Sequence, residues 1–357
     1  MAQANKNNFI SIGKALGIIL MVLGHSGCSG TSTKMIYFFH MPLFFLCSGY
    51  FFSNINSPND FKNYLKRKIK SLYIPFLKYS LVFILLHNCF IKLHIYSPQV
   101  PYYDYKCIYI ELIKAITMTD FELLIRPFWF IKELLLGSVL IASLSFILKS
   151  HFEKRHQYIV FSVLLFLAIF CRQFSIFLPI IGDISILFLC ASYIVLGTIY
   201  KKIEQYLSYN IIFIPITIII LWLGANSSIN HVDLRYIRAE EIPIYYILSI
   251  IGIHSIFSIS KIIMKFSIRH YFFYLGTHTM PIFALNLLAL KVGNLLKIFY
   301  FGLPIEQLAN HPVIFANNKY FFLIYTSCGI IIPLCLEYMY NKIKELVYIP
   351  YSHNKLS

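Results

Sequence analysis

The sequence predicts an all-α, polytopic membrane protein with about ten transmembrane helices and both termini in the cytoplasm. Hydrophobic residues make up 58% of the 357 residues and charged residues only 13%, against about 25% charged residues in soluble domains. The apolar residues fall in blocks about one bilayer long. Short segments rich in lysine and arginine separate alternate blocks. Helices suit such a chain because they satisfy their own backbone hydrogen bonds, which lipid cannot do.

The apolar blocks define the helices in order. The first block contains Lys14 and is followed by no small-x-small cleavage site, so we interpret it as a retained helix rather than a cleaved signal peptide. Pro179, Pro215 and Pro281 interrupt or shorten later blocks. No internal repeat stands out, so residues 1–357 are predicted to form a single membrane domain. The predicted helices lie near residues 8–27, 34–53, 72–92, 128–148, 157–177, 183–200, 209–225, 242–260, 271–291 and 320–340.

The distribution of charge predicts the orientation of the helices. Cations cluster in alternate connecting segments, which the positive-inside rule places in the cytoplasm. The opposite segments hold most of the acids, and two of them, near 93–127 and 292–319, are long. Long loops on one face either build a substrate site or lid, or simply cover the protein. The clustered cations include Lys62, Lys66, Arg67, Lys68, Lys70, Lys149, Lys154, Arg155, Lys201, Lys202, Lys261, Lys265 and Arg269.

The net charge of +16 indicates contact with lipid headgroups, because the cations flank hydrophobic segments. Membrane lipid is therefore an expected partner, and nucleic acid is not, since no aromatic-basic recognition module is present. The eight cysteines are scattered without a CxxC pair, and the histidines lack close ligand spacing such as HExxH. We therefore expect buried thiols and no metal site.

The first predicted helix carries two ionisable residues, Lys14 and His25, which are costly in a membrane and usually mark function. Eleven residues separate them by about 16 Å along a helix and by close to three full turns, so both side chains face the same way. Lysine suits an anion such as phosphate, and histidine suits proton abstraction. The pair could engage two ends of one long ligand. Alternatively, Lys14 extends to the membrane surface and His25 lies in a polar interface.

Two further segments carry polar groups. His40 lies near the predicted depth of His25, two residues before the Phe-rich segment that runs from Pro42 to Tyr50. A basic segment containing Arg67 and Lys70 leads directly into the third helix. These two cations either grip phosphates at the cytoplasmic mouth or serve only as a topology signal, and charge alone favours the topology signal.

Together these segments resemble the membrane acyltransferase type 3 family, in particular its fucose-4-O-acetylase-like branch and related polysaccharide O-acetyltransferases. The family's Arg/Lys-x10-His signature is matched by Lys14 and His25, and its basic RxxR element before Leu-x-x-Pro by Arg67 and Lys70. The resemblance covers most of the chain, with the sharpest motifs in 10–76. Further matches are Pro42 to Tyr50, the helix start at Leu72 and Pro75, Phe128-Trp129-Phe130, and Leu275-Gly276-Thr277-His278-Thr279-Met280-Pro281-Ile282.

The sequence departs from the family pattern at three positions. Lysines at 14 and 70 replace the more usual arginines, which loses the fork-shaped contacts of a guanidinium. Asn286 stands where relatives often carry histidine, which puts a direct role for that position in doubt.

The resemblance implies transfer of an acyl group, in the first place acetyl, from cytoplasmic acyl-CoA to a hydroxyl of a cell-surface or lipid-linked polysaccharide. The carbohydrate acceptor is then a partner, and the location is the bacterial plasma membrane. Lys14, Arg67 and Lys70 would meet the phosphates of the donor. His25 would act as general base on the hydroxyl.

The resemblance also suggests roles for three other residues. His40 would orient His25 or stabilise negative charge, and Trp129 would stack on a sugar ring. Glu133 would orient a histidine or bind sugar hydroxyls, or else pair with Lys132 or Arg126.

Two other functions are compatible with the composition. About ten helices with proline breaks suit a flippase or an exporter of a sugar-linked or organic-acid substrate. An inactive scaffold of a polysaccharide assembly complex is the third alternative. The sequence leaves open the acceptor sugar and its acylated position, the acyl group, transfer directly or through an acyl-enzyme, and the oligomeric state.

Overall fold

The computed structural model describes residues 2–149, 151–152, 156–227, 229, 231–316 and 319–352, so Lys154 and Arg155 lie outside the described residues. Nearly all of the described chain is helical, and its one sheet is a two-residue antiparallel hairpin. The elements are α1 (Ala2–His25), α2 (Gly30–Tyr37), α3 (His40–Tyr50), α4 (Pro58–Lys68), η1 (Ile69–Tyr73), α5 (Ile74–Lys92), α6 (Tyr105–Thr117), η2 (Leu123–Phe128), α7 (Trp129–Leu148), α8 (Gln157–Gln173), β1 (Phe177–Leu178), β2 (Gly182–Asp183), α9 (Ile184–Ile203), η4 (Glu204–Tyr206), α10 (Phe213–Ala225), η5 (Ala239–Glu241), α11 (Ile242–Ile263), α12 (Arg269–Thr277), α13 (Thr279–Phe301), η6 (Ile305–Ala309) and α14 (Phe321–Ser352).

The helices confirm the predicted fold class. Within the described residues, six helices are long and apolar enough to cross a membrane, and three shorter apolar helices accompany them. The pair α2 and α3 fills the place of the remaining predicted span. Together these elements are consistent with a polytopic membrane protein of about ten spans. The long ones are Pro58–Lys92, Leu123–Leu148, Ile184–Tyr206, Ala239–Ile263, Thr279–Phe301 and Phe321–Leu346, and the short ones Phe9–His25, Gln157–Gln173 and Phe213–Ala225.

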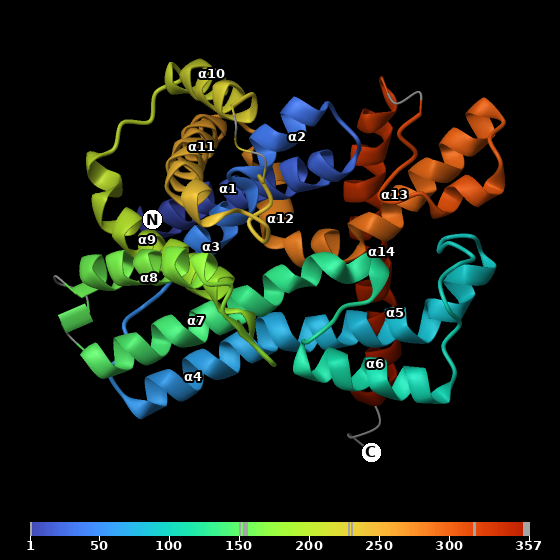
Figure 1. Cartoon of the computed structure of the whole chain (residues 1–357), viewed down its shortest axis with the longest axis horizontal. Coiled ribbons are helices and arrows are strands. Elements are labelled where there is room, and N and C mark those ends of the chain that lie inside the picture. Colours follow the sequence, from blue (N-terminus) through green and yellow to red (C-terminus); the bar gives the residue numbers. More distant parts are fainter. Residues whose placement is uncertain are drawn as a thin grey trace.

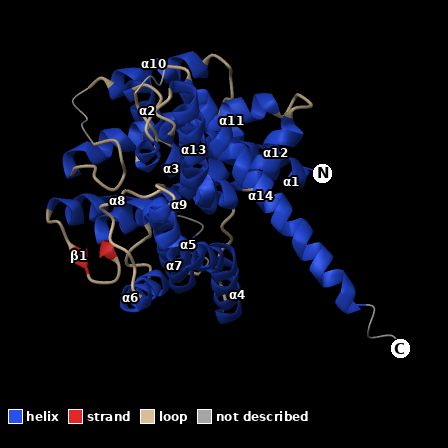
Figure 2. Cartoon of the chain, turned by 90° about the vertical axis from the view of Figure 1, so that its right-hand side faces the viewer, coloured by secondary structure: helices blue, strands red, loops and turns tan. Residues whose placement is uncertain are grey.

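Helix α1 runs through the interior of the protein. Ile10, Ile12, Ala15 and Val22 are fully buried, and the helix packs against α3, α11, α12, α13 and α14. Helices α4 and α5 form one nearly continuous rod, along which α7 lies (Figure 1). The far end of α14 projects away from the other helices (Figure 2). The motif-bearing helix is therefore held on several sides by other elements.

Two predicted helices are each divided in two. The segment predicted as 34–53 breaks at Phe39, whose φ is −133°, and His40 then begins α3. The segment predicted as 271–291 breaks at His278, between α12 and α13. A proline follows each break, Pro42 in one case and Pro281 in the other. Because proline lacks an N–H and its ring clashes with the carbonyl four residues earlier, it favours a break or kink at that point.

The long segments 93–127 and 292–319 are more ordered than the sequence predicted. The first contains α6 and η2, and helix α13 continues into the second as far as Phe301, where Gly302 ends it in the left-handed conformation with φ +61°. Both segments are anchored to buried side chains of neighbouring helices. They therefore present the residues they carry in fixed positions.

Candidate active site

The two ionisable residues of α1 line different cavities that share one wall. His25 lines a cavity of about 280 Å³, here called the His25 cavity, and Lys14 lines one of about 350 Å³, the Lys14 cavity. Both cavities are lined by Phe283 of α13. Lys14 and His25 therefore line two cavities that meet at Phe283, and their roles stay predictions.

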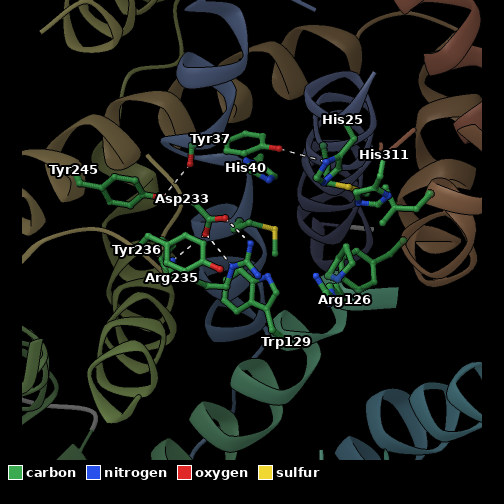
Figure 3. A pocket seen from close by; sticks show the side chains of 16 residues that line it. His25, Tyr37, His40, Arg126, Trp129, Asp233, Arg235, Tyr236, Tyr245 and His311 are labelled. Carbon is green, nitrogen blue, oxygen red and sulfur yellow. Dashed lines mark hydrogen bonds and ion pairs between the residues drawn. The ribbon is translucent and has the colours of Figure 1, made fainter. Parts of the chain in front are cut away.

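The His25 cavity gathers polar and aromatic side chains from segments far apart in the chain, from α1 to the segment after α13 (Figure 3). His25 has a single hydrogen bond among the described residues, 3.4 Å between its Nδ1 and Tyr37 Oη. The rings of Tyr37 and His40 lie 4.9 Å apart. The cavity is lined by Met21, His25, Tyr37, His40, Met41, Arg126, Pro127, Trp129, Asp233, Leu234, Arg235, Tyr236, Tyr245, Phe283, Leu287 and His311.

His40 is the first residue of α3 and is 5% exposed. A hydrogen bond to the preceding helix, α2, holds its ring in place. Its Nδ1 lies 3.0 Å from the carbonyl oxygen of Ile36, across the break between α2 and α3. That carbonyl only accepts, so Nδ1 carries the proton in this arrangement. His40 is thus brought to the same cavity as His25, and no hydrogen bond joins the two rings in the described structure.

An ion pair that the sequence analysis did not single out lies beside Trp129. The Asp233 carboxylate accepts hydrogen bonds from the Arg235 guanidinium at 2.7 Å and 3.2 Å, and another from the Arg235 backbone N–H at 3.0 Å. Burial raises the pKa of Asp233, but bonding to Arg235 outweighs it and leaves that pKa below its ordinary value. The Arg235 guanidinium carbon lies 5.2 Å from the centre of the Trp129 ring. Trp129 therefore lines the cavity beside an ion pair, and its role in stacking on a sugar stays a prediction.

His311 reaches the same cavity from the segment between α13 and α14. Lys291 of α13 donates hydrogen bonds to the carbonyls of Leu308 at 3.0 Å and Asn310 at 2.8 Å, which fixes this segment. Burial, together with the charges of Lys291 and Arg126, lowers the pKa of His311 to about 4. His311 is therefore neutral at pH 7.

The Lys14 cavity is mostly apolar around one cation. Phe44, Ile131 and Leu134 form part of its wall, with the hydroxyl of Ser48 nearby. In the described part of the chain, no hydrogen bond or ion pair is formed by the Lys14 ammonium group. The Ser48 hydroxyl is occupied by Lys68, whose Nζ lies 2.7 Å away. An ammonium group without a partner in an apolar cavity indicates a site for an anionic or polar ligand.

Arg67 and Lys70 line a third cavity of about 540 Å³, here called the Arg67 cavity. Both are exposed, and the other walls come from α4 and the segment after α3. Lys70 lines this cavity and the next residue, Ser71, lines the Lys14 cavity. Both residues lie in the π-turn η1 (Ile69–Tyr73). The Arg67 and Lys14 cavities are thus lined by neighbouring residues of η1, and the Lys14 and His25 cavities by the same Phe283.

Glu133 and Asn286 lie outside these cavities. Glu133 is 6% exposed, lines none of the three, and its Oε2 has no hydrogen-bond partner. Asn286 is fully buried and donates to the carbonyl of Phe283 at 2.6 Å, within its own helix. The catalytic role of Glu133 stays a prediction, and Asn286 is placed as a packing residue of α13.

The comparisons with known proteins address the whole chain. The family model of the acyltransferase domain of the acyltransferase type 3 family matches residues 7–338. The chain belongs to the acyltransferase type 3 family. This match establishes membrane-bound acyl transfer and implies an acyl donor. Neither the curated proteins nor the solved structures compared with this acyltransferase gave a match.

Proposed function

We propose that this acyltransferase moves an acetyl group from cytoplasmic acetyl-CoA to a hydroxyl of a surface or lipid-linked polysaccharide, at the plasma membrane of a bacterium. The observation that supports the proposal is that Phe283 lines both the Lys14 and the His25 cavity, and that η1 carries residues of both the Lys14 and the Arg67 cavity. The Arg67 and Lys14 cavities offer cations to the donor, and the His25 cavity offers the candidate base. A donor with phosphates at one end and a thioester at the end of a long arm matches that order.

The residues of the first two cavities fit acyl-CoA. The Arg67 cavity offers a guanidinium and an ammonium group to phosphates, which arginine binds through two parallel hydrogen bonds. The Lys14 cavity offers an apolar passage for the arm, and a single ammonium group for its amide oxygens. The thioester would then lie near Phe283, the residue that lines both remaining cavities.

In the transfer step, His25 acts as general base. With Nδ1–H donating to Tyr37, the lone pair of Nε2 accepts the proton of the acceptor hydroxyl. The hydroxyl oxygen forms a C–O bond to the thioester carbon, the C–S bond breaks, and the departing thiolate receives the proton from His25. General-base catalysis of this kind contributes about 10²–10⁴-fold. His40 donates its Nδ1–H to the carbonyl of Ile36, so its Nε2 can only accept a hydrogen bond. In this state His40 would orient a hydroxyl of the acceptor, and it has no N–H left to stabilise negative charge on oxygen.

The test is transfer of label in membrane vesicles. Radiolabelled acetyl-CoA is added outside inverted vesicles that contain native glycan, and incorporation into glycan is measured. Label in glycan supports the proposal. If the protein instead moves an organic anion along a gradient without acyl-CoA, and no label enters glycan, acetyl transfer from acetyl-CoA to glycan is wrong for this protein.

Removing two of the three cations that line the Arg67 cavity, Arg67 and Lys70, while keeping Lys66, is expected to weaken donor binding. We expect Arg67→Gln with Lys70→Gln to raise the KM for acetyl-CoA about 10-fold, because each exposed charge pair with a phosphate contributes up to ~1 kcal/mol. The effect should shrink at high salt. The matched control is Lys62→Gln, an exposed cation of α4 that does not line this cavity. A double variant with unchanged KM would show that the segment serves topology alone.

A further inference from the structure

The charged side chains that line the His25 cavity include one cation that is not paired with an acid and has no role in the mechanism above. Asp233 is its only acid, and Arg235 engages it through three hydrogen bonds. His311, with a pKa of about 4, is neutral. The remaining charged group is Arg126, whose guanidinium forms no hydrogen bond or ion pair with any residue that the structure describes. The cavity therefore has a surplus positive charge that nothing within the described chain neutralises.

Arg126 is held in place by its backbone. It lies in η2, where Leu124, Ile125 and Phe128 are buried and anchor the turn. The residue before that turn, Glu122, is buried and fixed on both carboxylate oxygens, by His87 at 2.5 Å and by Tyr103 at 2.9 Å. The His87 Nε2 in turn lies 3.0 Å from the carbonyl of Pro101. Arg126 is thus presented by a structured support and not by a loosely packed loop.

Trp129 lies three residues after Arg126 and lines the same cavity. Side chains three residues apart in a helical turn lie on the same side. Figure 3 shows both at the same end of the cavity, below His25 and His311. An aromatic ring offers a face for a sugar ring, and a guanidinium offers two parallel hydrogen bonds to a carboxylate or a phosphate. Arg126 is exposed, so with a neutral sugar its guanidinium would be bonded to water, whereas an anion would also pair with its charge.

We propose that the acceptor is an anionic glycan whose carboxylate or phosphate is bound by Arg126 while its sugar ring packs on Trp129. This inference rests on the proposed function, and names the class of its acceptor. The carboxylate would belong to an acidic sugar, and the phosphate to a lipid-linked carrier. In either case the anion sets the position of the ring, so that one hydroxyl is brought to His25.

Binding of the acceptor can be measured by tryptophan fluorescence, without the transfer reaction, because the sequence contains only two tryptophans. Trp222 is an exposed residue of α10 that does not line the cavity. In a Trp222→Phe background, in nanodiscs and without acetyl-CoA, the fluorescence of Trp129 reports ligand binding. The probes are a glucuronate-containing oligosaccharide, its carboxyl-reduced neutral derivative, and a neutral sugar on polyprenyl pyrophosphate.

We expect at least one anionic probe to bind Arg126→Gln about 10- to 100-fold more weakly than the parent, the loss typical of a hydrogen bond to a charged group. Arg126→Lys should restore part of the affinity. The neutral oligosaccharide should be little affected. The matched control is Lys106→Gln, an exposed cation of α6 outside the cavity, which should bind like the parent. Which anionic probe responds identifies carboxylate or phosphate as the bound group.

The outcomes separate this inference from the proposed function. The anion site is wrong if Arg126→Gln binds all probes as tightly as the parent. It is also wrong if the variant loses as much affinity for the neutral oligosaccharide as for the anionic probes. Both conclusions hold whatever the transfer assay gives. If anionic glycan binds through Arg126 but acetyl-CoA labels no acceptor, the anion site holds and acyl transfer to glycan is wrong.

Discussion

We expect His25→Ala to lower acetyl transfer to glycan by about 10²–10⁴-fold, the contribution typical of a general base. The imidazole is the group of α1 that reaches the cavity shared by Trp129 and His40. Without it, no equivalent neutral base replaces it on that helix. The measurement is incorporation of labelled acetyl from acetyl-CoA in inverted vesicles, normalised to the amount of inserted protein.

The loss should reflect chemistry and not folding. His25 is the last residue of α1 and only partly buried, and its one hydrogen bond, to Tyr37, is long at 3.4 Å. Truncating it therefore leaves no buried polar group without a partner. Tyr37→Phe separates orientation from proton transfer, because it removes the hydroxyl and keeps the base. We expect it to cost much less than His25→Ala.

His270→Gln serves as the control for loss of a histidine elsewhere. His270 is an exposed residue of α12 that lines none of the three cavities, so this variant should transfer acetyl at the parent rate. If His25→Ala transfers acetyl as fast as the parent, the general base is wrong although the family assignment stands. If transfer falls to the same extent as the amount of inserted protein, the residue has a structural role.

Most of the helices could be predicted because the signal is local. A run of about 20 apolar residues specifies a span regardless of its neighbours. The breaks and the π-turn were harder to predict, although a proline follows each of them in the sequence. Pro42, Pro75 and Pro281 each lie three to four residues after a break or π-turn, at Phe38–Phe39, Ser71 and His278 respectively. The three irregular turns all border the cavities, so the prolines place non-helical backbone at the site.

The candidate site likewise contains some residues that the sequence predicts and others that it does not. Six predicted residues lie on helices or the basic segment, and each lines one of the three cavities: Lys14, His25, His40, Arg67, Lys70 and Trp129. Asp233, Arg235 and His311 come from connecting segments, which reach the cavity only through tertiary contacts such as those of Lys291. No periodicity marks such residues. The one available signal was the presence of acids and histidines in long segments on one side of the membrane.

Substitution of Gly49 is expected to disrupt the fold. A Cβ at Gly49 would lie 1.8 Å from the carbonyl oxygen of Ile194, and one at Gly197 would lie 2.1 Å from that of Leu46. The two glycines allow α3 and α9 to pack backbone to backbone, as small residues do in membranes. Overpacking usually costs about 1–3 kcal/mol. Here the obstacle is backbone of a neighbouring helix, so Gly49→Ala should reach or exceed the upper end of that range.

The consequence for the site follows from the position of α3. That helix begins at His40 and contributes to the walls of both the His25 and the Lys14 cavities. Gly49→Ala should therefore lower both the thermal stability of the purified protein, measured in detergent, and acetyl transfer. The matched control is Gly30→Ala, since a Cβ there meets no atom within 4 Å. Equal melting temperatures for the two variants would mean that α3 and α9 are not in backbone contact, and that the walls formed by α3 are placed differently.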